Sequence, residues 1–431
     1  MRRNIAEMIR LIYQQDIVPS WLLANDNVLF SASQKKKYPW QKKSKMIYYA
    51  MKFSRVVYLS DFAIFVIGCF WISKALLTIR KNKKVSVSHN DYQKIFVCHG
   101  AHAEDFIFSD YCSRQNESIH KINVITLEGL EALTTPSILL LFRYLFHHAF
   151  GVSRKIKKLS QTLHFHCDDF LTCSAKNIGE YVFFSIIWRL AKAQGVNEVI
   201  FLALHVAAHA CPPEKMQFQY LSHGLMKLSI LPVKPNYSFM LTPEENAYFR
   251  SFFCHNVNCD LYPQYQLIDE GKNQEVLILS PEIIGVDADD IEKKFQDLLT
   301  WLSIKNFKIT LRPSPGCKQS VIAFLKNKFP ISFHWDIPTR DLFLSLKTIK
   351  PKFIIGLNST GLYTALCMGV LPISLCDPDP NHAVWNMVYP MRKRVLFWPR
   401  DQALLDSIMH SSALYDQSLH ELCTACDDEL C

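Results

Sequence analysis

The sequence contains no internal repeat and no low-complexity segment, and we expect no cleavable signal at its N-terminus, where Met1 is followed by two arginines and only short apolar groups. Its fourteen cysteines are scattered without the paired spacing of a disulfide or zinc framework. The nearest approach to a metal pattern is Cys423-Thr-Ala-Cys426, and one such pair is weak without a second. We therefore expect reduced cytosolic thiols, no metal site and no cofactor.

The body of the protein lacks a basic excess. The formal net charge is +9, yet residues 1–90 hold sixteen Lys and Arg against four Asp and Glu, so the rest of the chain is slightly acidic. Nucleic-acid binding would be favoured by basic residues on the folded domains with exposed aromatic side chains between them. We therefore expect no nucleic acid as a partner. The basic clusters flank an apolar stretch instead.

That apolar stretch, Val56–Ile79, has no uncharged run long enough for a typical membrane span. Its uninterrupted part, Phe62–Ser73, is shorter than the roughly 20 residues that a span needs. Asp61 and Lys74 would each cost a few kcal/mol deep in a bilayer. We expect a helix lying at a membrane surface or a helical hairpin packed on the body, with a span as the alternative. Residues 1–90 are expected to bind an anionic membrane surface, which implies a cytoplasmic protein peripheral to the inner face of the cytoplasmic membrane.

Beyond residue 90, short apolar runs alternate with longer amphipathic ones. This pattern predicts parallel sheets covered by helices, and 431 residues exceed what one core organises. The polar stretch Gln266–Gln274 separates two such series. The predicted regions are a helical basic appendage (1–90), two Rossmann-like α/β domains (91–265 and 275–400) and a C-terminal helix and tail (401–431).

Hydrophobic period and capping residues predict the individual elements. The expected strands are Ile95–Cys98, Ile122–Leu127, Leu163–Cys167, Glu198–Leu204, Phe218–Leu221, Tyr237–Leu241, Val276–Ser280, Phe307–Leu311, Ile331–His334, Phe353–Leu357 and Leu371–Leu375. The expected helices are Ser137–Phe150, Ile178–Gln194, Pro243–Phe253 after Thr242, Asp289–Ile304, Lys318–Lys328, Arg340–Thr348 and Leu362–Met368.

Residues 353–376 are the most informative segment. They predict a strand, a polar turn, a helix and a strand, with Asn358, Ser359 and Thr360 where the first strand ends. The free N–H groups of a helix start beside two hydroxyls form an anion site. A hydroxyl at this place can also simply cap the helix. We predict phosphate binding at this turn.

A second strand-to-helix turn precedes it, in Phe307–Gly316. Both turns are expected at the carboxyl edge of one parallel sheet, where open α/β sheets bind ligands. The residues of the two turns that we expect to contact the ligand are Arg312, Ser314, Pro315, Gly316, Asn358, Ser359 and Thr360.

In these two turns the sequence resembles the C-terminal half of GT-B glycosyltransferases of bacterial surface polysaccharides, including sialyltransferase-like enzymes. Those enzymes carry a His-Pro turn and then a Ser-Ser or Ser-Thr turn, and both turns serve the sugar nucleotide. Ser359 and Thr360 match the second turn. Ser314 and Pro315 occupy the first, where a serine cannot carry the positive charge of the family's histidine.

The resemblance implies a GT-B fold, in which an N-terminal acceptor domain and a C-terminal nucleotide-sugar-binding domain face a cleft. It also implies metal-independent sugar transfer from a nucleotide-sugar, first a CMP-nonulosonate such as a sialic-acid-like donor. The acceptor would be a cell-surface glycan or a lipid-linked glycan. The alternatives are a UDP-sugar or polyol-phosphate transferase of the same fold, and a non-catalytic glycan-assembly scaffold with a degenerate GT-B fold.

Sugar transfer needs a base for the acceptor hydroxyl and groups that stabilise the departing phosphate. Asp168 and Asp169 are expected at a strand end in the first domain. Sialyltransferase-like families have an acidic pair followed by Gly in a comparable loop, whereas Phe170 follows here; a pair that only caps a helix is the alternative. His223, in a His-Gly after Phe218–Leu221, resembles the His-Gly of surface-polysaccharide transferases. We predict Asp168, Asp169 and His223 as the catalytic residues.

Other polar groups are weaker candidates. Asp269-Glu270-Gly271 matches the letters of the family's acidic motif but lies in the predicted linker. His99 follows the first strand, and His382 follows the last strand of the second domain. Asp377-Pro-Asp379 has the letters of a metal motif, but its prolines indicate a rigid loop.

Overall fold

The computed structural model describes most of both predicted domains. The described residues are 53, 56–82, 92–98, 107–109, 111–113, 119–133, 136–163, 167–202, 206–211, 216–222, 236–240, 242–253, 258–261, 273–279, 288–313, 333–337, 342–357, 359–376 and 391–425.

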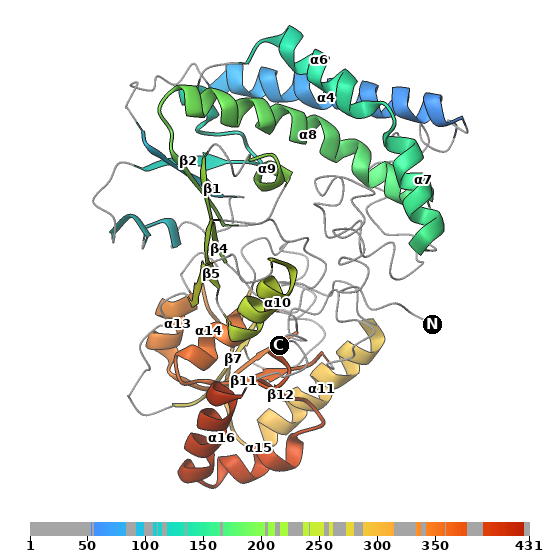
Figure 1. Cartoon of the computed structure of the whole chain (residues 1–431). Helices are drawn as coiled ribbons and strands as arrows, with labels where there is room; N and C mark the ends of the chain where they lie inside the picture. The colour runs from blue at the N-terminus through green and yellow to red at the C-terminus, as the bar shows by residue number, and fades with distance from the viewer. Residues whose placement is uncertain are drawn as a thin grey trace. The chain divides into compact units, whose positions relative to one another are not determined.

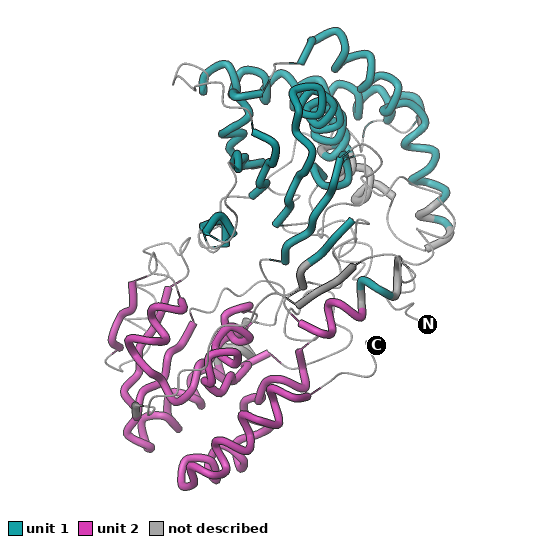
Figure 2. Tube along the Cα trace, turned by 60° about the vertical axis from the view of Figure 1, so that its left-hand side comes forward, with its two compact units in different colours: residues 1–223, 228–240, 249–260 teal, residues 224–227, 241–248, 261–431 magenta. Residues whose placement is uncertain are grey.

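The chain forms two compact units (Figure 2). Unit 1 consists of residues 1–223, 228–240 and 249–260, and unit 2 consists of residues 224–227, 241–248 and 261–431. Each unit contains a six-stranded sheet, and the pairings are parallel among the first five strands of the first sheet and among all six strands of the second. The predicted fold class, two Rossmann-like α/β domains, is confirmed.

The sheet of unit 1 has the strand order β2-β1-β3-β4-β5-β6. Its strands are β1 (Lys94–Cys98), β2 (Ile119–Asn123), β3 (Glu198–Phe201), β4 (Gln217–Leu221), β5 (Tyr237–Met240) and β6 (Asn258–Leu261). The helices of this unit are α4 (Val57–Asn82), η3 (Leu130–Ala132), α6 (Ile138–Ala149), α7 (Val152–Leu163), α8 (Cys167–Ala193) and α9 (Val206–His209). Helix α10 (Pro243–Phe253) begins in unit 2 and ends in unit 1.

Aromatic side chains cover both faces of this sheet. Phe201 of β3 contacts Trp188 of α8, with ring centroids 5.6 Å apart. Val97 is the register partner of Phe201, so the neighbouring Phe96 points to the opposite face. There Phe96 contacts Phe108, with centroids 4.9 Å apart. Cover on both faces explains why the two central strands, β1 and β3, are apolar after their first residue.

The predicted strand Leu163–Cys167 is wrong. Helix α7 ends at Leu163 and helix α8 begins at Cys167, so Asp168 and Asp169 lie in the first turn of α8. A short apolar run cannot be assigned to strand or helix by period alone. Carboxylates are favoured in a first helical turn because they complement the helix dipole. The two aspartates therefore lie within a helix, whereas their predicted catalytic position was the end of a strand.

Strand β2 also differs from its predicted range. It covers Ile119–Asn123 instead of Ile122–Leu127. The side-chain oxygen of Asn123 accepts hydrogen bonds from the N–H groups of Ile125 (2.9 Å) and Thr126 (3.1 Å). This local turn ends the strand, because the backbone donors turn toward the side chain.

A buried carboxylate anchors helix α4 in unit 1. Asp61 is 2% exposed, and its two oxygens accept hydrogen bonds from the N–H groups of Gly151 (2.8 Å) and Ser153 (2.9 Å) at the start of α7. Asp61 thus caps α7 from another helix. Farther along, a Cβ added to Gly179 of α8 would lie 3.0 Å from the carbonyl oxygen of Gly68. Helix α4 therefore packs on the body of unit 1.

The sheet of unit 2 has the strand order β12-β11-β10-β7-β8-β9. Its elements are β7 (Asn273–Leu279), α11 (Ala288–Ile304), β8 (Lys308–Arg312), β9 (His334–Trp335), α13 (Leu342–Ile349), β10 (Pro351–Gly356), α14 (Gly361–Cys367), β11 (Leu371–Ser374), β12 (Leu396–Phe397), α15 (Gln402–Met409) and α16 (Ser412–Thr424). The predicted helix Lys318–Lys328 lies outside the described residues.

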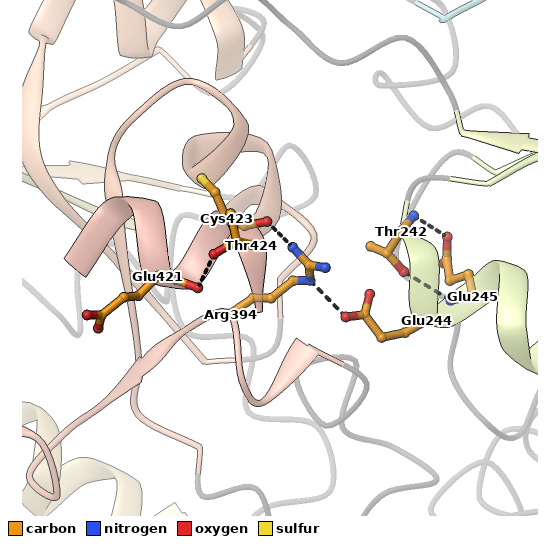
Figure 3. A network of polar contacts seen from close by, with 7 residues as sticks. All are labelled: Thr242, Glu244, Glu245, Arg394, Glu421, Cys423 and Thr424. Carbon is orange, nitrogen blue, oxygen red and sulfur yellow. Dashed lines mark hydrogen bonds and ion pairs between the residues drawn. The ribbon is translucent and has the colours of Figure 1, made fainter. Parts of the chain in front are cut away.

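A polar network fixes the start of α10 within unit 2 (Figure 3). Thr242 and Glu245 form a capping box, since the N–H of Glu245 donates to Thr242 Oγ1 (3.1 Å) and the N–H of Thr242 donates to Glu245 Oε2 (3.3 Å). Beside them, Arg394 donates to Glu244 Oε1 (2.8 Å) and to the carbonyl oxygen of Cys423 (2.7 Å). The Glu244 and Arg394 side chains are only 1% and 7% exposed.

We expect Arg394→Met to lower the free energy of unfolding of unit 2 by about 3 kcal/mol, because it leaves the buried Glu244 carboxylate without its charge partner. Arg400→Met is the matched control. Arg400 also pairs with a carboxylate, that of Asp401, but its side chain is 56% exposed, so the expected loss is below about 1 kcal/mol. Urea unfolding followed by tryptophan fluorescence measures both, and equal losses would contradict the assignment.

Candidate nucleotide-binding site

The strand order of unit 2 defines a ligand-binding edge. Reading from β9, the order is β9-β8-β7-β10-β11-β12, so β7, the first strand of the unit, lies between β8 and β10. This is the doubly wound order 3-2-1-4-5-6, which reverses direction between its first and fourth strands. Ligands of such sheets bind beyond the carboxyl ends of the strands at that reversal. Here the reversal lies between β7 and β10.

The predicted Ser-Thr turn lies at this reversal. Strand β10 ends at Gly356 and α14 begins at Gly361, with the half-buried Ser359 and Thr360 between them. The third predicted turn residue, Asn358, lies outside the described residues. The structure therefore places two hydroxyls at the edge where a nucleotide is expected.

Gly361 brings the start of α14 close to the end of β7. A Cβ at this position would lie 2.8 Å from Leu279 Cδ1 and 2.9 Å from Leu342 Cδ2, closer than real Cβ atoms approach their neighbours. Only glycine allows this approach without a shift of the two leucines. Prediction from the sequence missed this residue, although a glycine directly after the Ser-Thr pair is a recognisable pattern for close helix-to-strand packing.

The N–H groups of this helix start are already engaged, contrary to the predicted row of free donors. The N–H of Gly361 donates to Ser359 Oγ (3.1 Å), and that of Leu362 donates to the carbonyl oxygen of Ser359 (3.2 Å). The N–H groups of Tyr363 (3.0 Å) and Thr364 (3.1 Å) donate to the carbonyl oxygen of Thr360. The turn is tight enough to satisfy its own donors. A hydroxyl that accepts one hydrogen bond still has its proton to donate, so an anion here would be held first by hydroxyls.

Arg312 lies at the carboxyl end of β8, as predicted, but its positive charge is balanced by a buried carboxylate. Its guanidinium donates to Asp336 Oδ2 (2.6 Å) and Ser345 Oγ (2.8 Å), and the side chains of Arg312 and Asp336 are 10% and 3% exposed. This buried pair ties β8 to the end of β9 and to α13. Direct phosphate binding by Arg312 would require it to share or break this pair, so we assign Arg312 a positioning role. Prediction from the sequence missed Asp336, because it lies 24 residues from Arg312 and nothing local links the two residues.

Several predicted site residues cannot be placed. Ser314, Pro315, Gly316 and His223 lie outside the described residues, as do the weaker candidates His99, His382, Asp377, Asp379 and residues 269–271. The backbone of Asp168 and Asp169 is helical, while their side chains lie outside the description.

Unit 1 has a reversal of its own. Its order β2-β1-β3-β4-β5 is the second common doubly wound arrangement, which reverses between β1 and β3. Strand β1 ends at Cys98, directly before His99 in the sequence, and β4 ends at Leu221, shortly before His223. Both histidines thus follow strands of the parallel sheet, unlike Asp168 and Asp169. Within the described part of the chain, no group of three or more His, Cys, Asp and Glu residues is placed to hold a metal ion.

No protein-family model matches the chain, and no curated protein matches it. Among solved structures, it is similar to the spinosyn rhamnosyltransferase SpnG complexed with thymidine diphosphate, with 10% identity over 77% of this chain and 96% of that one and a TM-score of 0.43. It is also similar to Acinetobacter baumannii MurG, with 10% identity over 79% and 97% and a TM-score of 0.38. A third likeness is to Methanocaldococcus jannaschii UDP-GlcNAc 2-epimerase in complex with UDP-GlcNAc and UDP, with 12% identity over 65% and 83% and a TM-score of 0.39. Likenesses this distant transfer neither a substrate nor an activity.

Proposed function

We propose that this protein is a GT-B glycosyltransferase that moves a sugar from a nucleotide-sugar to a cell-surface or lipid-linked glycan. It acts without a metal, on the cytoplasmic side of the membrane. The observation that carries the proposal is the Ser359 and Thr360 turn at the reversal between β7 and β10. Nucleotides bind at such reversals in Rossmann-like sheets. The resemblance in the two turns supports the further step to sugar transfer.

A CMP-linked nonulosonate is the proposed donor, and the resemblance of the Ser359 and Thr360 turn to that of sialyltransferase-like enzymes supports it. Such a donor carries one ionised phosphate and the ionised carboxylate of its sugar, so its net charge equals that of a UDP-sugar and the choice rests on the resemblance. Ser314 stands where the resembling enzymes have a histidine, so hydroxyls would hold the phosphate in place of an imidazolium.

In the arrangement that the resemblance to GT-B enzymes implies, the C-terminal domain holds the donor and the N-terminal domain supplies the base for the acceptor hydroxyl. His223 is our first choice for that base, because it follows strand β4, which ends at Leu221. Imidazole titrates near neutral pH and can accept the acceptor proton. Asp168 and Asp169 remain candidates, although their place in the first turn of α8 favours a capping role.

A non-catalytic nucleotide-binding scaffold is the second candidate. The engaged N–H groups of α14 and the Arg312 to Asp336 pair both favour it, since each removes a group that could stabilise a departing phosphate. Hydrolysis of CMP-sugars and UDP-sugars, with and without a glycan acceptor, separates the two functions. A scaffold binds nucleotide without releasing sugar.

One prediction of this function concerns nucleotide binding. In a thermal-shift panel of CMP, CDP, UDP, GDP and dTDP, we expect CMP to raise Tm most. The proposed donor is a CMP-sugar, and a ligand that binds only the native state stabilises that state according to its affinity. Ser359→Ala with Thr360→Ala should weaken that binding about tenfold, on the scale of one or two hydrogen bonds to a charged group.

The matched control for this variant is Ser303→Ala with Thr348→Ala. Both of these hydroxyls donate to carbonyl oxygens four residues back in their own helices, so the control removes two hydroxyls from unit 2 outside the turn. It should leave nucleotide affinity unchanged. A folded Ser359 and Thr360 double variant with full affinity would remove this turn from the site.

The second prediction concerns the base. His223→Ala should lower turnover roughly 10²- to 10⁴-fold while donor affinity stays nearly constant, as expected for loss of general-base catalysis. His410→Ala, at an exposed histidine after α15, is the control. Sugar transfer to acceptor is the measurement. If Asp168→Asn or Asp169→Asn abolishes transfer while His223→Ala retains it, the base is the acidic pair and our choice is wrong.

A further inference from the structure

Helix α4 carries an apolar stripe on its exposed face. Tyr58, Leu59, Phe62, Val66, Phe70 and Leu77 follow one another at intervals of one to seven residues, and each is 48% to 68% exposed. From Tyr58 to Leu77 the stripe is about 29 Å long at the rise of an α-helix. The opposite face is buried and, apart from Asp61, also apolar, with Ile64, Ile72 and Ile79 at 0% to 2% exposure. A helix that is apolar all round is normally covered on every side.

The stripe continues onto helix α6. The ring of Phe65 on α4 lies 5.9 Å from that of Phe146 and 6.4 Å from that of Phe150, and these two rings lie 4.5 Å apart. Phe146 is 56% exposed, and Leu139, two turns earlier on α6, is 82% exposed. We call these nine exposed residues the α4–α6 face: Tyr58, Leu59, Phe62, Val66, Phe70, Leu77, Leu139, Phe146 and Phe150.

This face lies on the outermost layer of unit 1. Figure 1 shows α4 and α6 side by side along α8, and α8 packs on the sheet through Trp188 and Phe201. The sheet already has its cover on this side, so the α4–α6 face is not required for the core. A contiguous exposed apolar surface of this kind marks an interaction site.

The charges around the face are of one sign. Helices α4, α6 and α7 together contain eight Lys and Arg residues and a single acidic residue, Asp61. Asp61 is buried as the cap of α7 and offers no negative charge at the surface. The basic residues are Lys74, Arg80, Lys81, Arg143, Arg154, Lys155, Lys157 and Lys158, and all but Lys157 are exposed.

We propose that the α4–α6 face inserts into one leaflet of an anionic lipid bilayer, with α4 lying in the plane of the membrane. Apolar side chains next to basic ones match the boundary between acyl chains and anionic headgroups. A second copy of this chain is a poor occupant, because it would bring eight further positive charges against these. Helix α4 is long and apolar enough to cross a membrane, but its contacts to α7 and α8 keep its other face on the protein.

Vesicle binding of the full chain tests this surface without any donor or acceptor, so its outcome is independent of the proposed enzymatic function. Sedimentation with phosphatidylcholine vesicles that contain phosphatidylglycerol should capture the protein, and phosphatidylcholine alone should capture much less. Phe62→Ser with Phe70→Ser should lower the affinity for anionic vesicles by about tenfold or more, because two large apolar side chains no longer enter the bilayer. Lys74→Gln with Lys81→Gln should lower it mainly at low salt.

Ile304→Ser with Leu344→Ser is the matched control, since it replaces two apolar side chains of unit 2 that are 71% and 51% exposed. It should leave vesicle binding unchanged. Leu139→Ser, at the most exposed residue of the face, is a second variant for the same vesicle-binding measurement if the double phenylalanine variant folds poorly. Unchanged binding in a folded face variant would overturn the proposal. So would a face variant that dissociates a dimer without changing vesicle binding, or protein that resists alkaline extraction from membranes as a true span does.

Discussion

Parallel sheets must be covered on both faces, and most of this structure depends on that constraint. In unit 1 the register partners Val97 and Phe201 face one side, and Phe96 faces the other. Helix α8 covers the first side through Trp188. Because α8 is itself apolar on its outer side, α4 and α6 must cover it in turn. Each layer covers the apolar surface of the layer beneath it. The outermost layer, formed by α4 and α6, still presents apolar side chains to the outside.

Features that depend on neighbouring residues could be predicted from the sequence. Helix α10 has its predicted bounds, Pro243–Phe253. Its start could be predicted because the two residues of its capping box, Thr242 and Glu245, lie three positions apart in the sequence. The order of β10, the polar turn and α14 was also predicted correctly, because the three segments follow one another in the sequence without interruption. In these places the chain specifies its structure locally.

Features that depend on distant residues could not be predicted. Arg312 and Asp336 are 24 residues apart, and Glu244 and Arg394 are 150 residues apart. Each of these charges reads as an exposed or catalytic group when taken alone. Burial next to an opposite charge changes that reading, because an unpaired buried charge is costly. Asp168 and Asp169 were misplaced for a related reason: the run before them is too short to show whether it is a strand or the end of a helix.

Helix α4 shows why composition alone leaves the relation to a membrane open. A bilayer and a protein core are both apolar, so a helix with apolar residues all round satisfies either environment. Asp61 distinguishes between them. A carboxylate deep in a bilayer needs donors that lipid does not provide, whereas the start of α7 offers the N–H groups of Gly151 and Ser153. Those bonds orient α4: the side that carries Asp61 must face the protein, and the stripe from Tyr58 to Leu77 must then face outward. One polar residue thus decides which apolar face belongs to the core and which faces outward.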